Sequence, residues 1–272
     1  MTAGVIAVVG GSGRLGRLVT TELLSRGRRV QVLVRDPVRA GLLLGPDVEV
    51  LPLDVRRAQD VDLALRGAAT VLLLAHGFLG GRGAPQAVDH HGTANVARTA
   101  TTIGADVVMV SMLGAGPDSP MELARAKYAG EQALQASGAA WTVVRAGPFL
   151  ETWQQVLRDT TGRSGRPLVL GRGRRPIPFV PVADVAALVV RAALDPCLRG
   201  QALTVGGPLQ SLTDLAETVQ HQDRRGRAPR HLPRVGLRGA AALAYVAPAF
   251  ARRASTALVM DTEDLPRVAV PT

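Results

Sequence analysis

Four closely spaced glycines near the start of the chain have the pattern of a phosphate-binding turn. They are Gly10, Gly11, Gly13 and Gly16. An apolar run over residues 5–9 precedes them, and leucines and valines then recur at helical spacing up to Gly27. Glycines allow a backbone to approach a pyrophosphate closely, and a helix beginning near Arg14 directs N–H groups and about half a positive charge toward it. Strand, glycine turn and helix in this order predict a dinucleotide-binding βαβ unit.

One lysine stands out among the basic residues. Lys127 is the only lysine of the chain, and the other residues counted as basic at neutral pH are arginines. A compact ammonium makes hydrogen bonds that the wide, planar guanidinium of arginine does not reproduce. A solvated surface lysine is the alternative interpretation. We favour a specific role for Lys127 because a chain that otherwise uses arginine keeps a lysine here, and the family resemblance given below implies contact with the nicotinamide ribose.

The end of the second predicted strand, over residues 29–34, bears on the choice of cofactor. At this position a carboxylate accepts from the 2′-hydroxyl of NAD, whereas an arginine pairs with the 2′-phosphate of NADP. Asp36 lies twenty residues after Gly16, which is the spacing of the NAD carboxylate. Arg35, however, is the first residue after the apolar run, and Asp36 precedes a proline, as a helix cap does. The sequence therefore favours NADP, with Arg14 as a second positive charge.

Polar residues also follow the third and fourth predicted strands, over residues 48–53 and 70–75. Asp54 comes directly after the third strand. It can accept from an adenine amino group, cap the helix expected over residues 56–65, or do both. His76 follows the fourth strand, and ligands lie beyond the carboxyl ends of parallel strands. We therefore expect His76 next to the cofactor, where it is also a candidate proton donor.

Strands and helices continue to alternate along the chain. Helices are expected over residues 88–102 and 121–136, and strands over residues 106–110 and 141–145. This alternation predicts an α/β fold with a Rossmann-type, doubly wound parallel sheet.

The pattern loosens after residue 150. We expect a glycine- and arginine-rich loop over residues 162–175 and an apolar helix over residues 181–193. A helical stretch over residues 240–258 would cover the substrate pocket or contact a second copy of the chain. We divide the chain into a cofactor-binding core, residues 1–150, and a small substrate lobe, residues 151–272, packed together as one compact unit.

Composition narrows the class of protein. The chain has 272 residues and 47% hydrophobic side chains, enough for a large core. Its single cysteine, Cys197, excludes an internal disulfide framework, and the adjacent pair His90 and His91 lacks the partners of a metal site. The net charge is +10, but the arginines are scattered and only 3% of residues are aromatic, which argues against nucleic-acid binding. No apolar run reaches the ~20 residues of a membrane span, so we expect a cytoplasmic protein without membrane contact.

Several motifs along the chain together resemble one family. They lie at residues 10–16, 34–37, 110–115, 126–127, 137–138, 141–149 and 179–186. In this order they are similar to the atypical short-chain dehydrogenases/reductases of the NmrA-like, NAD(P)H-binding group. The resemblance implies an NADP-type cofactor and a substrate lobe formed largely after the sixth strand.

The chain departs from the wider superfamily on the helix that carries the lysine. Reductases of the superfamily use Tyr-x-x-x-Lys, in which the tyrosine is the acid and the lysine lowers its pKa and holds the nicotinamide ribose. Lys127 matches the lysine, but Leu123 stands four residues earlier, and Tyr128 points about 100° away around the helix. Ser111 lies near the family's serine position. The proton would therefore come from water, the substrate, Ser111 or His76.

These observations define an explicit candidate site. The catalytic candidates are Lys127, Ser111 and His76. The cofactor-binding candidates are Gly10, Ser12, Gly13, Arg14, Leu15, Gly16, Arg35, Asp54, Val55, Ala75, His76, Gly77, Lys127, Gly147, Pro148 and Phe149. The substrate-pocket candidates are Phe78, Met112, Phe149 and Trp153, and no metal site is expected.

The function that we favour is an NADPH-dependent reduction of a small, largely apolar carbonyl or conjugated substrate. Because the usual tyrosine is missing, two alternatives remain. One is a non-catalytic NADP(H) sensor that binds a protein partner, and the other is a non-redox enzyme on the same fold.

Overall fold

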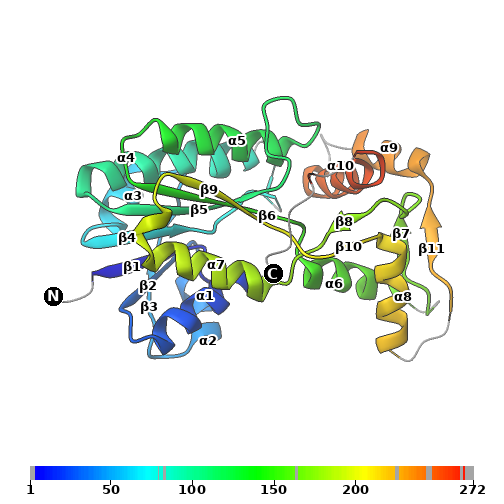
Figure 1. Cartoon of the computed structure of the whole chain (residues 1–272), viewed down its shortest axis with the longest axis horizontal. Helices are drawn as coiled ribbons and strands as arrows, with labels where there is room; N and C mark the ends of the chain where they lie inside the picture. The colour runs from blue at the N-terminus through cyan, green and yellow to red at the C-terminus, as the bar shows by residue number, and fades with distance from the viewer. Residues whose placement is uncertain are drawn as a thin grey trace.

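A seven-stranded parallel sheet forms the centre of the molecule in the computed structural model (Figure 1). The structure describes residues 4–78, 80–81, 84–162, 165–223, 227–242, 247–263 and 266. The strand order is β3-β2-β1-β4-β5-β6-β9. The strands are β1 (Val5–Val9), β2 (Val30–Val34), β3 (Glu49–Pro52), β4 (Ala68–Leu73), β5 (Asp106–Met112), β6 (Trp141–Ala146) and β9 (Gln201–Val205).

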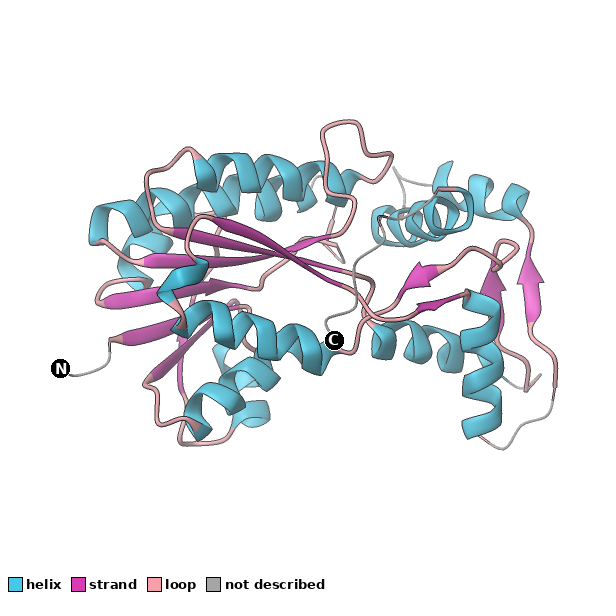
Figure 2. Cartoon of the chain, in the orientation of Figure 1, coloured by secondary structure: helices cyan, strands magenta, loops and turns pink. Residues whose placement is uncertain are grey.

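Helices cover both faces of this sheet, which explains why its strands are apolar on both sides (Figures 1 and 2). In β1, Ile6 and Val8 pack toward one face, and Ala7 and Val9 pack toward the other. The first face carries α1 (Arg14–Ser25), α2 (Pro37–Leu44) and α7 (Val182–Leu194). The second carries α3 (Ala58–Ala64), α4 (Thr93–Ile103) and α5 (Glu122–Gln135). The predicted doubly wound α/β fold is thereby confirmed.

The helix expected over residues 88–102 begins differently from the prediction. Residues Gln86–Gly92 form a π-helix, η1, which continues directly into α4. Asp89 is buried in this turn, whereas His91 is exposed. The rings of His90 and His91 lie 4.7 Å apart, and the described ranges contain no group of three or more side chains suited to hold a metal ion.

A smaller lobe follows β6 and packs around buried side chains such as Leu157, Phe179, Leu215 and Met260. Its strands pair as β7 (Leu168–Leu170) with β11 (Arg230–Leu232), and as β8 (Ile177–Pro178) with β10 (Leu209–Gln210). Its helices are α6 (Leu150–Thr161), α8 (Leu212–Gln222), α9 (Arg234–Ala242) and α10 (Pro248–Thr262). Within the part of the chain that the structure describes, no helix has both the length and the apolar character to cross a membrane.

The chain returns to the core after the lobe has begun, which differs from the expected division at residue 150. Strand β9 pairs with β6, and α7 packs against α1 on the sheet. The buried side chains of Val185, Val189 and Val190 explain why α7 lies on the sheet. Strand β7 also lies inside the expected loop over residues 162–175, because β11 supplies its partner from far along the chain.

Candidate cofactor and active site

The candidate site lies where the order of the sheet reverses. Strands β1 and β4 are neighbours, but the helices that follow them cover opposite faces, so their carboxyl ends open a crevice. The Gly10 N–H donates to the Leu33 carbonyl (2.8 Å), and the Leu74 N–H donates to the Val9 carbonyl (2.9 Å). The turns after β1 and β4 therefore begin directly at the carboxyl ends of these strands, where the topology predicts a ligand.

The glycine turn fits a phosphate group, as judged by the space around each glycine. Gly10 has φ +85°, and a Cβ there would lie 2.8 Å from the Ala75 nitrogen. A Cβ at Gly16 would lie 2.5 Å from the Gly11 Cα, so this glycine allows the turn and the helix to pack. Gly13 is different, because the nearest atom to its Cβ position is 3.5 Å away. Gly13 is the N-cap of α1 and offers no side-chain acceptor to the helix, which leaves room for an anion.

The first turn of α1 places its other candidate residues in different environments. Leu15 is buried and anchors the helix against the core, and Ser12 is half-buried. Arg14 is exposed at the first helical position. The turn therefore presents backbone N–H groups and a guanidinium at the same end of the helix.

The residues at the end of β2 have separate roles. Asp36 caps α2, with Oδ1 accepting from the Arg39 N–H (3.0 Å), as the sequence predicts. Arg35 is exposed, and it forms no hydrogen bond or ion pair with the described residues. The carboxylate at the NAD spacing thus caps a helix, while the adjacent guanidinium forms no hydrogen bond or ion pair with a carboxylate among those residues.

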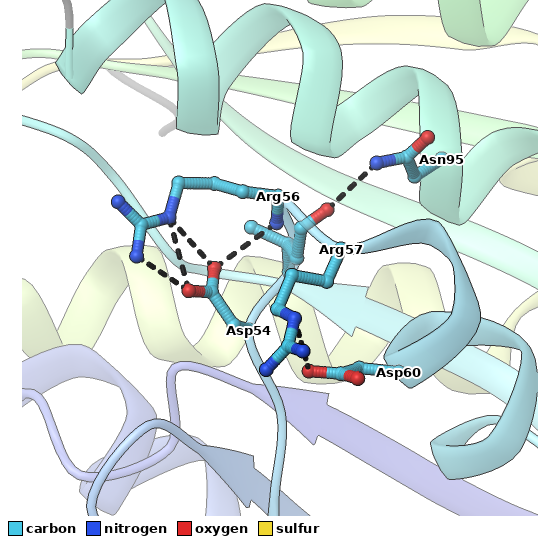
Figure 3. Close-up of polar contacts among 6 residues, drawn as sticks. Asp54, Arg56, Arg57, Asp60 and Asn95 are labelled. Atoms are coloured by element: carbon cyan, nitrogen blue, oxygen red, sulfur yellow. Dashed lines mark hydrogen bonds and ion pairs between the residues drawn. The ribbon is translucent and has the colours of Figure 1, made fainter.

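Asp54 and Val55 are fixed by contacts on both sides (Figure 3). Arg56 donates to Oδ1 of Asp54 through Nε (2.9 Å) and its backbone N–H (3.1 Å), and to Oδ2 through Nη2 (2.5 Å). From α4, the Asn95 amide donates to the Val55 carbonyl (2.9 Å). These contacts hold the segment after β3 at the edge of the sheet.

Asp54 does not cap α3, because the helix begins at Ala58 with Arg57 in the N-cap position. The hydrogen bond from Arg56 is the largest influence on the pKa of Asp54 and lowers it; desolvation opposes this effect, and the charge of Arg35 contributes to the lowering. The Asp54 side chain is therefore an anionic acceptor at the end of β3, and the prediction that it caps the following helix is wrong.

Lys127 is buried, so the interpretation as a solvated surface lysine is wrong. Its side chain is 7% exposed, and Nζ lies 3.0 Å from Oδ1 of Asp89. The ammonium also donates to the carbonyls of Val110 (2.8 Å) and Ala75 (3.4 Å). The ammonium thus donates to two carbonyls, and its contact with Asp89 is an ion pair in which Oδ1 has no hydrogen-bond partner among the described residues. Leu123 stands one turn earlier on α5 and offers no acid.

Asp89 connects three elements behind the crevice, and sequence reasoning did not single it out. Its side chain is fully enclosed, with Oδ1 facing Lys127 and Oδ2 accepting from the Gly77 N–H (2.8 Å). Helix α5 approaches the π-helix closely at Gly130, where a Cβ would lie 2.1 Å from the Asp89 carbonyl oxygen. Asp89 therefore ties the segment after β4 and helix α5 to the π-helix.

Ser111 belongs to a second buried network. Its hydroxyl donates to Oε1 of Glu131, and Arg145 donates to both oxygens of the same carboxylate (3.1 Å each). The Glu131 side chain is fully enclosed. Glu131 lies four residues after Lys127, and this spacing on one helix face is the signal by which the sequence could have revealed it. The Ser111 proton is thus committed to a carboxylate that supports α5 on the sheet.

His76 keeps an exposed surface at the end of β4. The Phe78 N–H donates to its Nδ1 (3.3 Å), so the proton of the neutral ring lies on Nε2. Desolvation by the surrounding protein lowers the pKa of His76, and the charge of Lys127 lowers it further, while Asp89 partly opposes both. At neutral pH the site therefore presents an uncharged imidazole with one N–H donor.

The segment after β4 is also held by the lobe. Arg252 of α10 is buried, and its guanidinium donates to the carbonyls of Phe78 (2.9 Å), Gly80 and Gly81 (3.2 Å). The carboxylate of Glu122 lies 3.5 Å from the same guanidinium. A residue of the last described helix thus sets the path of the segment that carries Phe78.

The four substrate-pocket candidates belong to different packing groups. Met112 packs beside Val259 of α10, and Phe149 packs against the core beneath α7. Trp153 packs in the lobe, with its ring 6.4 Å from that of Phe179. Phe78 and Met112 thus both neighbour α10, and Trp153, in the lobe core, also packs against the cluster that contains Ala254 and Ala257 of this helix.

Gly147 and Pro148 form the junction between the core and the lobe. The Gly147 N–H donates to the Val205 carbonyl (2.8 Å), and the Pro148 carbonyl accepts from the Val180 N–H (3.0 Å). A Cβ at Gly147 would lie 2.3 Å from the Pro178 carbonyl oxygen. The close backbone contact explains why a glycine follows β6.

Comparison with known proteins agrees with this geometry. The model of a family described as NAD(P)H-binding matches residues 10–196, which is more than half of the chain. An NAD(P)H azoreductase of Xenophilus azovorans is 29% identical over 230 residues, which cover 84% of this chain and 76% of that protein. A (4-alkanoyl-5-oxo-2,5-dihydrofuran-3-yl)methyl phosphate reductase of Streptomyces griseus is 31% identical over 231 residues, which cover 83% and 76%.

A solved structure shows the same fold. An NADPH-dependent quinone oxidoreductase of Escherichia coli, complexed with NADPH, superposes with a TM-score of 0.75 at 24% identity. The superposition covers 95% of this chain and 91% of that one. The seven-stranded sheet and the small lobe therefore form an arrangement that also occurs in solved structures.

Proposed function

Because the chain belongs to the NAD(P)H-binding family, among relatives of the short-chain dehydrogenases/reductases, we propose that it is an NADPH-dependent reductase of a small, largely apolar carbonyl or conjugated substrate. The observation that carries the choice of NADPH is the end of β2. There Asp36 caps a helix, and Arg35 forms no hydrogen bond or ion pair with a carboxylate in the described part of the chain, although its charge acts on Asp54. A 2′-phosphate would give Arg35 the anionic partner that it lacks there.

Apart from the 2′-phosphate, the cofactor would lie along the carboxyl ends of β1 and β4. The free N–H groups at the start of α1 would hold the pyrophosphate at Gly13, and Asp54 would accept from the adenine amino group. The nicotinamide, when bound, supplies a hydride. The segment Ala75–Gly77 would border it, since Lys127 and Asp89 fix this backbone from behind.

Without a cofactor, Lys127 supports the segment after β4 through its contacts with Asp89 and Ala75. Its contact with the ribose would be made in addition to this structural role. Its ammonium already donates to two carbonyls and is paired with Asp89, and the longest of these contacts is the one to Ala75 (3.4 Å). A ribose hydroxyl would therefore bind Lys127 by replacing that contact. The ion pair with Asp89 would remain and keep the ammonium in place.

His76 is the candidate that offers a proton donor at the crevice. Its neutral tautomer carries hydrogen on Nε2, whereas the Ser111 proton is directed into the buried carboxylate of Glu131. We therefore assign Ser111 a structural role in holding α5 against the sheet. His76, water and the substrate remain the candidate proton donors. The His76 N–H would hydrogen-bond the oxygen of a carbonyl substrate and withdraw charge from it.

The names of the relatives support a conjugated substrate. One relative is named for azo reduction, and the other for reduction of an oxo-dihydrofuran, and both names describe unsaturated groups. The partly buried side chains of Phe78 and Met112 supply apolar surface near α10 for such a group. An azo dye, an unsaturated lactone and a quinone are therefore suitable first acceptors in an NADPH-consumption assay.

Titration of three proteins with NADPH and NADH tests the cofactor assignment. A charge-assisted hydrogen bond contributes about 1.5–3 kcal/mol, so Arg35→Asp should weaken NADPH binding roughly ten- to hundred-fold. NADH binding should be less affected or improved. Gly13→Asp should abolish binding of both, because its carboxylate enters the pyrophosphate position, yet it should fold, since its Cβ has room and aspartate is a favourable N-cap.

Two results would overturn the proposal. If the wild-type protein binds NADH more tightly than NADPH, then Arg35 does not bind the 2′-phosphate of the ribose. NADPH binding without consumption in the presence of any acceptor, combined with cofactor-dependent capture of a protein, would instead favour the sensor alternative.

A further inference from the structure

The lobe contains a cavity of about 620 Å³, here called the lobe cavity, that is separate from the glycine turn. All of its lining residues belong to the lobe, and Figure 1 places β7, α8 and β11 on the side of the lobe farthest from the sheet. The volume is that of a small-molecule site. Its ionisable lining residues are Arg172, Arg174, His231 and Arg234, and none of them is acidic.

The charges around the lobe cavity are not balanced. Arg234 is paired with Asp261, with Nε 2.6 Å from Oδ2 and Nη2 2.7 Å from the Asp261 carbonyl oxygen. The guanidinium groups of Arg172 and Arg174 are exposed and have no hydrogen bond or ion pair with the described residues. Two positive charges at one cavity therefore lack a counter-charge from this part of the protein.

The loop that carries both arginines is fixed in shape. Oδ1 of Asp261 accepts from the backbone N–H groups of Arg172 (2.8 Å) and Gly173 (2.9 Å). Gly171 and Gly173 have φ +78° and +64°, and a Cβ at Gly171 would lie 2.4 Å from the Asp261 carboxyl carbon. Burial alone would raise the pKa of Asp261, but the hydrogen bonds from Arg234, Arg172 and Gly173 lower it. The carboxylate thus stays ionised and holds the loop.

Other lining residues suit the apolar part of an organic ligand. The Thr213 hydroxyl does not open into the cavity, because its oxygen is buried and lies 2.7 Å from the Cβ position of Gly173. His231 donates from Nδ1 to the Gly171 carbonyl (3.2 Å), which holds the ring on the same loop. Pro233 and Val235 add apolar surface. The lobe cavity therefore combines an apolar wall with two arginines whose guanidinium groups have no partner among the described residues.

We propose that the lobe cavity binds a small organic phosphate monoester, with Arg172 and Arg174 holding the phosphate group. A phosphate monoester carries a charge of about −1.5 to −2 at neutral pH, which matches the two unbalanced guanidinium groups. Arginine forms paired hydrogen bonds with phosphate oxygens, and the remaining volume accommodates the organic part. This site is independent of the cofactor site and does not rest on the proposed reductase function.

Calorimetric titration with phenyl phosphate tests the proposal. Wild-type protein should bind it saturably, and the double variant Arg172→Gln/Arg174→Gln should bind it at least about tenfold more weakly. The double variant should fold normally, because neither side chain has a partner in the described structure, and an unchanged melting temperature checks this. Arg253→Gln removes another exposed arginine, on α10, and should bind phenyl phosphate like the wild type.

Two further titrations distinguish the lobe cavity from the cofactor site and from a site for anions in general. Arg35→Gln removes the arginine expected to hold the cofactor's phosphate, and it should leave phenyl phosphate binding unchanged. Benzoate should bind more weakly than phenyl phosphate. Equal affinity in the wild type and the double variant, loss of binding in Arg35→Gln, tighter binding of benzoate, or no binding by the wild type would each overturn the proposal.

Discussion

At the scale of single residues, the buried ion pair between Lys127 and Asp89 is the contact that most strongly supports the back of the crevice. Both side chains are removed from water, with exposures of 7% and 0%. Removing one partner of such a pair leaves an uncompensated charge and costs about 3–5 kcal/mol. The pair also fixes Gly77 and Ala75, which border the expected nicotinamide position.

A double-mutant cycle should separate the structural and binding roles of this pair. Asp89→Asn keeps an acceptor for the Gly77 N–H but removes the charge, and Lys127→Met removes the ammonium. Each single variant should lose about 3–5 kcal/mol of unfolding free energy, and the double variant should lose less than the sum. Urea denaturation measures these free energies.

NADPH titration of the same variants gives the second readout. If Lys127 contacts the ribose, the double variant should regain stability without regaining NADPH affinity. Additive losses of stability would show that the two residues are not coupled. Wild-type affinity in the double variant would limit Lys127 to a structural role.

The pH dependence of stability should report on His76. Its pKa is lowered in the folded protein, so the unfolded chain binds more protons once the pH falls below about 6.5, and stability then decreases. His76→Ala should therefore lose less stability than the wild type between pH 7 and pH 5.5. His90, whose pKa is also lowered by burial, remains in both proteins and cancels in the comparison. Parallel stability curves would contradict the lowered pKa.

Residues whose role follows from local pattern were predictable, and residues whose role depends on distant contacts were not. Asp36 as a helix cap follows from the adjacent proline, and the structure confirms it. Asp89 lies 38 residues before Lys127, so no short spacing relates the two. Arg252 contacts a carbonyl 174 positions away, and nothing in its own segment distinguishes it from the adjacent Arg253.

At the scale of elements, the contact between α5 and the π-helix depends on a glycine. Gly130→Ala would place a Cβ 2.1 Å from the Asp89 carbonyl oxygen, and overpacking of this kind costs about 1–3 kcal/mol. Gly239→Ala is the matched control, because Gly239 is also helical and has no atom within 4 Å of its Cβ position. This control should gain up to about 1 kcal/mol from helix propensity.

Thermal unfolding and NADPH titration compare these two variants. Gly130→Ala should melt at a lower temperature and bind NADPH more weakly, since the displaced π-helix carries Asp89. If both alanines change stability in the same direction, the close approach at Gly130 is not needed.

The strands of the core were predictable for a physical reason that does not extend to the lobe. The central core strands are covered on both faces, so they read as nearly continuous apolar runs, as in Val5–Val9. Strands β7 and β11 are three residues long and pair across about sixty positions, which leaves too little pattern to recognise. The π-helix escaped prediction because, besides Gly92, its seven residues contain only two apolar side chains, those of Ala87 and Val88, which are too few to define a period.

At the scale of the whole molecule, Arg252 joins the last described helix to the segment that follows β4. Arg252→Gln should free the carbonyls of Phe78 and Gly81 and should weaken NADPH binding and lower the melting temperature. The adjacent, exposed Arg253 offers the control, since Arg253→Gln should change neither property. Hydrogen exchange at residues 76–81 should rise only in the first variant. Equal hydrogen-exchange rates in the two variants would show that Arg252 does not hold this segment.

The late position of Arg252 also sets an order of events during protein synthesis. A chain that has left the ribosome as far as residue 200 contains all the residues that we assign to the dinucleotide, but it lacks strand β9 at the edge of the sheet. The carbonyls of Phe78 and Gly81 are anchored only after α10 has emerged, because their guanidinium partner is the residue at position 252. We therefore expect nascent chains to gain affinity for the cofactor only after residue 252 has emerged from the ribosome. A stop codon shortly before position 252 should abolish that affinity while leaving the complete glycine motif in the product.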